Sequence, residues 1–388
     1  MKKKREKGSA VNKIKVILVL LVLVIAAGLF IFNHARRLIS PPPAFEEEHV
    51  ISSRLKQTID KVDHVIYESV YSLGIKKEAI SFSKVVPRHE TNLDWDFTEL
   101  SVIIDNPDFI NRLETIITKK IVMLGHDVIL KTEKSSGDLA VLSITVFNLP
   151  THRLKLHLRT ANTTKKIAKL PRVAFIIDDI GYDSAIADAF MGLKIPVCLS
   201  VLPDTPYSKE IAQNIVKRKK EMLLHLPMEP KGYPGINPGQ DALMLNMDRE
   251  TIQKIVREDI KKLPGLKGVN HHMGSLFSED YIRMKYVLDE IKKHDLYYID
   301  SRTTNLTVAF KVAKALGIPA AEKSLFIDND LNEKTLVYQM ERLLGIARNR
   351  GEAIGIGHPH LKTLNILKKY TEQLMKEFEV VPVSELVR

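Results

Sequence analysis

Cysteine is almost absent from this chain of 388 residues, and Cys198 is the only one. An internal disulfide needs two thiols, so no disulfide framework can hold this fold together. Cys198 lies in the apolar, strand-like stretch Ile195–Pro203. Such surroundings favour a buried, inert thiol over a nucleophile.

Several motifs that mark common enzyme classes are missing as well. The chain has neither a GxxxxGK[ST] phosphate loop nor a GxSxG motif, so phosphoryl transfer and serine-hydrolase chemistry lack their usual residues. It also has no HExxH motif and no pair of CxxC motifs for a structural zinc site. No repeat of about 20 to 50 residues is visible, which argues against a solenoid.

Positive charge is concentrated at the beginning of the chain. The formal net charge is +11, and residues 1–15 hold seven Lys or Arg against one Glu. This short segment therefore carries more than half of the excess charge, and the distribution argues against nucleic acid as a partner.

An uncharged apolar run, residues 16–32, follows the basic segment. Its seventeen residues reach the short end of the roughly 17 to 25 that span a bilayer. The preceding positive charge predicts a single-pass anchor in the inner (cytoplasmic) membrane, with the main domains on the extracytoplasmic (periplasmic) side. A cleaved signal peptide is the alternative, but the following Asn33–Arg37 offers no small-x-small cleavage site. We therefore favour an uncleaved transmembrane signal anchor.

Composition divides the next part of the chain into three segments. Residues 33–49 contain consecutive prolines and glutamates, which predict a stiff, solvated spacer. Residues 50–158 combine helical and strand-like apolar patterns, so we expect a small α+β domain. Its histidines are scattered and form no catalytic pattern, which favours a packing or docking module. The polar residues 159–170 predict a linker.

Residues 171–388 alternate short apolar runs with helical patterns. About seven such strand-then-helix units follow one another, beginning with the run Val173–Ile177. Continuous apolar runs of this kind are typical of strands buried on both faces of a parallel sheet. The pattern predicts an α/β fold with a parallel sheet, either open or closed into a barrel.

Polar residues gather where these expected strands end. In parallel α/β folds the carboxyl ends of the strands share one edge, which is where active sites form. The residues at these ends are Asp178 and Asp179, His225 and Glu229, His271 and His272, Asp300 and Arg302, Asp328, and His358 and His360. Five of the six histidines beyond residue 171 are among them.

Each of these residues alone has a structural explanation. A carboxylate pair before a helix can cap it, Asp300 and Arg302 can form an ion pair, and a His-Pro-His sequence can simply make a turn. Their shared position at the strand ends favours chemistry instead. Carboxylate and imidazole ligands suit zinc or another borderline divalent ion, so the pattern predicts a metal-assisted hydrolytic site.

Five motifs carry a resemblance to a known family. In this order and spacing, FIIDDIG, LHLPMEP, NHHMGS, IDSRTT and IGHPH resemble the divergent polysaccharide deacetylase family, a distant branch of the NodB-like carbohydrate esterases. The resemblance covers about residues 171–388. It implies a distorted (β/α) barrel, here of about seven strands, and a metal-dependent enzyme that removes N- or O-linked acetyl groups from a sugar polymer of the cell envelope.

The resemblance also implies a metal-binding set. Asp178 matches the family's catalytic base, and Asp179 and His225 match metal ligands. The family's next ligand is a histidine four residues after His225, but this sequence has Glu229 there. We expect His272 to supply the third ligand, with Glu229 as the alternative, and zinc to be the ion.

Further roles follow from the same resemblance. His358 matches the histidine that protonates the leaving group, and Asp300 and Arg302 are expected to orient the base and the acid or to hold substrate. Ser275 and His360, together with Glu229, are expected to contact substrate.

Two other functions compete with deacetylation. The altered second motif is compatible with an inactive envelope protein that binds glycan or a protein partner through the same cleft. A metal-dependent phosphodiesterase is less well supported, because such sites often use two metals and more carboxylate ligands than this sequence offers.

Overall fold

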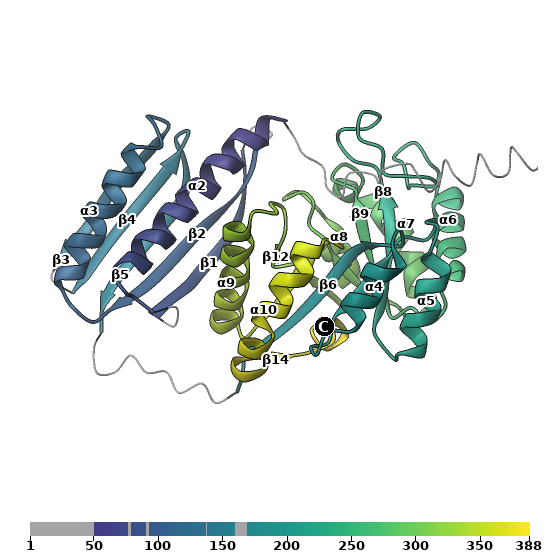
Figure 1. Cartoon of the computed structure of the whole chain (residues 1–388). Coiled ribbons are helices and arrows are strands. Elements are labelled where there is room, and N and C mark those ends of the chain that lie inside the picture. The colour runs from purple at the N-terminus through teal and green to yellow at the C-terminus, as the bar shows by residue number, and fades with distance from the viewer. Residues whose placement is uncertain (1–49, 77–78, 91–92, 137, 160–168) are drawn as a thin grey trace, which may run out of the picture. The chain divides into compact units, whose positions relative to one another are not determined.

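The computed structural model describes residues 50–388, except 77–78, 91–92, 137 and 160–168 (Figure 1). The expected anchor, residues 16–32, and the expected spacer, residues 33–49, lie outside the described residues. Within the described part, no helix combines the length and apolar character needed to cross a bilayer.

The first part of the described chain, up to residue 158, contains a five-stranded sheet in the order β1-β2-β5-β4-β3. All its pairs are antiparallel except β2 with β5. Side chains alternate between buried and partly buried along β4, and the buried positions of α3 follow a helical period, so both elements bury one face. The elements are α2 (Val50–Ser72), β1 (Ile80–Glu90), β2 (Leu93–Ile104), α3 (Asp108–Val122), β3 (Val128–Ser136), β4 (Leu139–Val146) and β5 (Leu149–Leu158).

The remainder of the chain, from residue 172, contains a parallel sheet in the order β11-β10-β9-β8-β7-β6-β13-β12, and β14 also pairs with β6. The expected alternation of strands and helices is confirmed. The strands are β6 (Arg172–Ile180), β7 (Cys198–Val201), β8 (Met222–Met228), β9 (Gly268–Met273), β10 (Tyr297–Asp300), β11 (Ala320–Glu322), β12 (Leu325–Phe326), β13 (Glu352–Gly357) and β14 (Glu379–Val380).

Helices cover this parallel sheet and connect its strands (Figure 1). They are α4 (Ser184–Met191), α5 (Ser208–Lys217), α6 (Arg249–Lys262), the 3₁₀ turn η2 (Phe277–Glu279), α7 (Tyr281–Lys292), α8 (Ala309–Ala315), α9 (Glu333–Arg350), α10 (Leu361–Glu377) and the 3₁₀ turn η3 (Val383–Glu385).

The parallel sheet differs from the expected barrel of about seven strands. Eight strands follow one another in its order, and β11 and β12 lie at the two ends without pairing with each other in the described part. The curled sheet is therefore open at this seam. The additional strand, β11, is only three residues long, and the short run Ala320–Glu322 carries no period from which a strand could be predicted.

The buried strands explain why the apolar runs are continuous. From Val173 onward every residue of β6 is buried, and all residues of β8 and β9 are buried as well. Polar residues at these ends therefore sit in a water-poor environment. This burial sets the electrostatics of the candidate site.

One polar cluster joins α9 to the first sheet. The buried carboxylate of Asp63 accepts hydrogen bonds from the Tyr338 hydroxyl and from His152 Nε2, the latter at 2.8 Å. Arg342 of α9 donates to Asp96 of β2 at 2.9 Å. A buried carboxylate needs such partners, because an unpaired charge would carry a large desolvation cost.

Replacing Tyr338 by Phe is expected to lower the free energy of unfolding by about 1.5 to 3 kcal/mol, since a hydrogen bond to a buried carboxylate is lost. Urea denaturation followed by circular dichroism measures the change. Tyr281→Phe, which alters a half-exposed side chain, is the matched control. Equal stability of the two variants would contradict the assigned bond.

Candidate functional site

A bulge at the end of β6 brings two adjacent carboxylates to one place. Neighbouring side chains of a regular strand point to opposite faces. Here the register with β7 shifts between Ile177 and Ile180, and Asp179 has a left-handed φ of 55°. Both carboxylates consequently approach one imidazole: Asp178 Oδ1 lies 3.8 Å from His225 Nδ1, and Asp179 Oδ1 lies 2.9 Å from His225 Nε2.

Asp179, His225 and His272 form a compact cluster. One potential ligand atom from each residue lies within 4.8 Å of the others. Asp179 Oδ1 is 2.8 Å from His272 Nδ1, and all three residues are at most 2% exposed. His225 lies on β8 and His272 on the adjacent strand β9. Pro227, which comes two residues after His225, pairs in register with His272, so the two strands hold the histidines close together.

The atoms of this cluster converge without forming good hydrogen bonds. Both carboxylate oxygens of Asp179 and both ring nitrogens of His272 lack a partner of hydrogen-bond geometry among the described residues. Buried polar atoms normally have such partners. One carboxylate and two imidazoles are a donor set that suits zinc with an open coordination position. The residues therefore fit a divalent ion, and the residue that completes the cluster is His272 rather than Glu229.

Burial and charge separate the two aspartates. Burial raises the pKa of Asp178, although the imidazoles of His225 and His358 oppose the shift. Burial would also raise the pKa of Asp179, but His272 and His225 outweigh it and hold that pKa well below its usual range. Asp179 is therefore suited to be an ionised ligand, and Asp178 is the more basic carboxylate.

His358 at the end of β13 has its own carboxylate partner. Its Nδ1–H donates to Asp328 Oδ1 at 2.8 Å, and its backbone N–H donates to Asp328 Oδ2 at 2.7 Å. The hydroxyl of Thr363 also donates to Asp328. Burial would raise the pKa of Asp328, but His358 and these hydrogen bonds outweigh it and lower the pKa. A carboxylate that fixes Nδ1–H leaves Nε2 as the nitrogen that exchanges protons.

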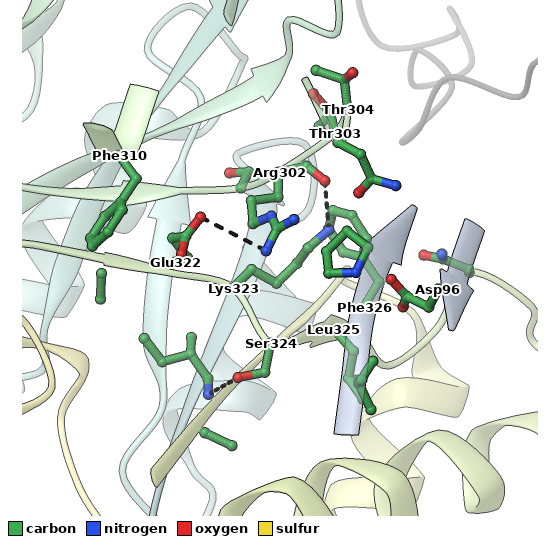
Figure 2. Close-up of a pocket in the computed structure, with 18 of the residues that line it drawn as sticks. Asp96, Arg302, Thr303, Thr304, Phe310, Glu322, Lys323, Ser324, Leu325 and Phe326 are labelled. Atoms are coloured by element: carbon green, nitrogen blue, oxygen red, sulfur yellow. Dashed lines mark hydrogen bonds and ion pairs between the residues drawn. The ribbon is translucent and has the colours of Figure 1, made fainter. Parts of the chain in front are cut away.

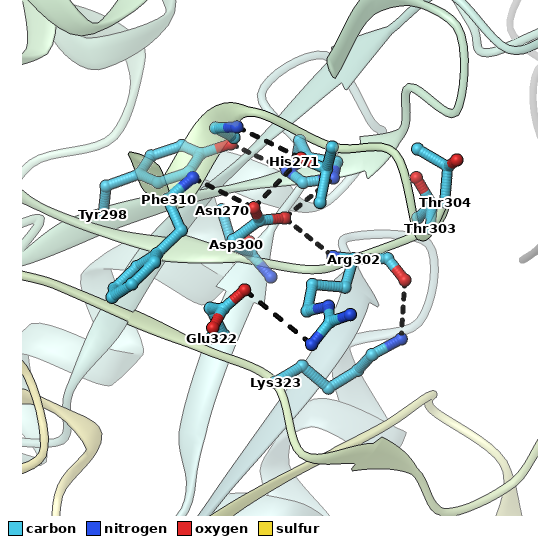
Figure 3. A network of polar contacts seen from close by, with 12 residues as sticks. Asn270, His271, Tyr298, Asp300, Arg302, Thr303, Thr304, Phe310, Glu322 and Lys323 are labelled. Carbon is cyan, nitrogen blue, oxygen red and sulfur yellow. Dashed lines mark hydrogen bonds and ion pairs between the residues drawn. The ribbon is translucent and has the colours of Figure 1, made fainter. Parts of the chain in front are cut away.

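The expected orienting role of Asp300 and Arg302 is not supported by their contacts. Asp300 accepts from the backbone N–H groups of Arg302 and Phe310 at 2.9 and 3.0 Å, as Figure 3 shows. Arg302 lies 3.8 Å from Glu322 (Figure 2) and contacts neither Asp178 nor His358 among the described residues. Strand order explains this result, because three strands lie between β10 and β6.

The other expected substrate contacts lie in loops just after the strand ends. Glu229 accepts from the backbone N–H of Leu245 at 2.6 Å, and Ser275 accepts from that of Lys231 at 3.0 Å, so both stabilise loops. His360 is half-buried, with its ring centre 6.5 Å from that of His358.

A cavity of about 730 Å³ opens beside these residues. Asp178, His225, His272, His358 and Arg302 all line it. Figure 2 shows its wall near Arg302. The cavity thus brings together residues from five strand ends, and Arg302 remains a candidate for substrate binding.

Two site residues were not assigned roles from the sequence. Asp328 stands at an expected strand end, but nothing local pairs it with His358, thirty residues away. Asn270 is buried inside β9 and contacts both Asp178 and His225. Its only sequence signal is a polar residue within a buried strand.

Fold and site together define an α/β protein with a candidate metal site at the carboxyl edge of its parallel sheet. The chain belongs to the divergent polysaccharide deacetylase family, whose family profile matches residues 175–387. The resemblance inferred from the five motifs is thereby confirmed.

Two relatives and a solved structure each match more than half of this chain. The uncharacterized protein YibQ of Escherichia coli (strain K12) is 30% identical over 216 residues, which cover 56% of this chain and 67% of YibQ. An uncharacterized protein of Haemophilus influenzae is 28% identical over 222 residues, covering 56% and 77% respectively. Among solved structures, the uncharacterized protein ATU2773 from Agrobacterium tumefaciens C58 is 25% identical with a TM-score of 0.54, covering 58% of this chain and 92% of that one.

Proposed function

We propose that this chain is a metal-dependent deacetylase that hydrolyses the acetyl amide or ester of an envelope glycan. The observation that carries the proposal is a single cavity lined by Asp178, His225, His272 and His358. It combines a basic carboxylate, a fitting ligand set and a carboxylate-paired histidine. Membership of the deacetylase family supports the acetylated sugar as substrate.

Asp179, His225 and His272 would hold the ion, for which we propose Zn²⁺. When bound, it would polarise the acyl carbonyl and lower the pKa of a water molecule. Asp178 is then the general base. Its raised pKa strengthens its affinity for the water proton, and it need not serve as a ligand.

His358 is the general acid in this proposal. An amine is a poor leaving group unless its nitrogen receives a proton, and His358 Nε2 can deliver one. Asp328 holds the Nδ1–H at 2.8 Å and stabilises the protonated ring. The pair therefore supplies both the orientation and the charge that an acid needs.

One observation favours the alternative, a catalytically inactive protein that binds glycan or a protein partner in the same cleft. The family's second histidine ligand is replaced by Glu229, and this residue bonds a backbone N–H instead of joining the cluster. His272 compensates in the active proposal. Turnover, not structure, separates the two functions.

We also propose an extracytoplasmic location. The basic residues 1–15 before the apolar residues 16–32 support a single-pass anchor in the inner membrane. An acetylated envelope glycan would be accessible from that side. Alkaline phosphatase fused after residue 388 tests the orientation, because it is active only when exported.

Metal content is the direct test of the proposed centre. The purified full-length chain is expected to hold about one equivalent of zinc, and Asp179→Ala and His225→Ala are expected to lose it, because three protein ligands are needed. Elemental analysis after purification without chelator measures it. His294→Ala is the control, because this histidine lies two residues after the end of α7 and outside the cluster. A wild type still metal-free after a zinc reload would overturn the proposal.

A further inference from the structure

Asn270 connects the proposed base to a proposed metal ligand. Its side chain has no exposed surface, and its Nδ2 donates to Asp178 Oδ1 at 2.8 Å. On the other side, its Oδ1 accepts from His225 Nδ1 at 2.9 Å. The hydroxyl of Ser200 donates to the same oxygen. One amide therefore contacts two functional side chains that come from different strands.

The charge of Asp178 fixes the orientation of this amide. A carboxylate only accepts hydrogen bonds, so the Asn270 NH₂ must face Asp178 and the Asn270 oxygen must face His225. An amide oxygen also only accepts, which requires the proton of His225 on Nδ1. The Nε2 lone pair is then directed to Asp179, 2.9 Å away, where the ion would bind.

The same amide keeps the base away from the ligand. Asp178 Oδ1 lies 3.8 Å from His225 Nδ1, too far for a hydrogen bond but close enough for one after a small rotation. Without Asn270, the Nδ1–H would be unpaired and Asp178 would be its nearest acceptor. A carboxylate that accepts a hydrogen bond from this N–H is less available to accept a proton from water.

We propose that Asn270 is a positioning residue that holds His225 in its metal-binding tautomer and keeps Asp178 available as a base. This inference rests on the proposed function. Metal-binding histidines usually donate their second N–H to a carboxylate or a backbone carbonyl. Here a neutral amide takes that place, because a second carboxylate beside Asp178 would add a repelling charge.

Two substitutions separate the two contacts. Asn270→Leu removes both, so Zn²⁺ affinity is expected to fall about 10- to 100-fold. Asn270→Asp keeps an acceptor for His225 but has no donor for Asp178. We expect this variant to retain Zn²⁺ affinity and to lose about 100-fold in turnover. A residue that only stabilises the fold would not produce this split.

The test measures Zn²⁺ affinity by competition with a chromophoric chelator, and acetate release from an N-acetylglucosamine oligomer. Full-length wild type, both variants and the control Ser200→Ala are compared, and circular dichroism verifies folding. Ser200→Ala is expected to stay within about fivefold of wild type in both measurements, since it loses one neutral hydrogen bond. Should Asn270→Leu fail to fold, Asn270→Asp alone still tests the split between metal binding and turnover.

The outcomes distinguish this inference from the proposed function. The inference is overturned if Asn270→Leu binds Zn²⁺ as tightly as the wild type does, or if both variants lose the same amount of affinity. In either case, acetate release by the wild type still supports the deacetylase. A wild type that binds Zn²⁺ but releases no acetate overturns the deacetylase, and the affinity difference between the variants then still supports the hold on His225. Failure of the wild type to bind Zn²⁺ overturns both.

Discussion

Replacing Asp178 by Asn should slow acetate release from an N-acetylglucosamine oligomer by about 10²- to 10⁴-fold while zinc content stays unchanged. The substitution removes the proton acceptor but preserves shape. The side-chain oxygen of the new asparagine at position 178 can still accept the hydrogen bond from Asn270 Nδ2, so Asn270 keeps its position on β9. Burial raises the pKa of Asp178, which increases the affinity of this carboxylate for a proton. No other carboxylate of the described residues contacts His225 without belonging to the ligand cluster.

The measurement pairs acetate release with elemental analysis on the same samples. Asp183→Asn is the matched control, because Asp183 stands in the loop after β6 but only caps α4 through the N–H groups of Ala185 and Ile186. Asparagine is an equally good cap, so this control should be as active as wild type. Unchanged turnover in Asp178→Asn would assign the base to another residue. Loss of zinc in this variant would show that Asp178 is a ligand.

The strand ends could be predicted because their signals are local. A continuous apolar run predicts a strand buried on both faces, and chain direction then places the residue after it at the shared edge. Asp178, Asp179, His225, His272 and His358 were all identified in this way. The structure brings four of them to one cavity and places Asp179 in the adjoining cluster with His225 and His272. The bulge that turns both aspartates to one side was not foreseeable, because φ is positive at Asp179 without a glycine to indicate it.

Partnerships between strands could not be predicted from the same information. Which strand lies beside which is a long-range property, and it decides that Asp328 contacts His358 while Asp300 on β10 lies remote from β6. We therefore expected Asp300 and Arg302 to orient the base and the acid, whereas in the structure Asn270 contacts Asp178 and Asp328 contacts His358. Sequence order alone made these candidates equivalent.

His358→Gln should lose amide hydrolysis far more than ester hydrolysis. For an N-acetylated sugar, the amine leaves only after protonation, so loss of the acid should cost about 10²- to 10⁴-fold. For p-nitrophenyl acetate, the phenolate leaves without a proton, and the rate should stay within about tenfold of wild type. Gln keeps a polar side chain that can donate to Asp328, so the buried carboxylate is not left unpaired. The ratio of the two rates therefore reports proton delivery rather than folding.

Asp178→Asn should lose both activities, because water must be deprotonated for either substrate. The two variants thus give different patterns on the same pair of substrates, and each serves as a control for the other. Lys362→Gln, an exposed position at the start of α10 four residues after His358, controls for local disturbance. If His358→Gln loses amide and ester hydrolysis equally, His358 is not the general acid and is only a structural partner of Asp328. A selective loss would establish that the carboxylate-paired histidine of β13 acts on the leaving group, and with it that the cavity is a site of hydrolysis rather than of binding alone.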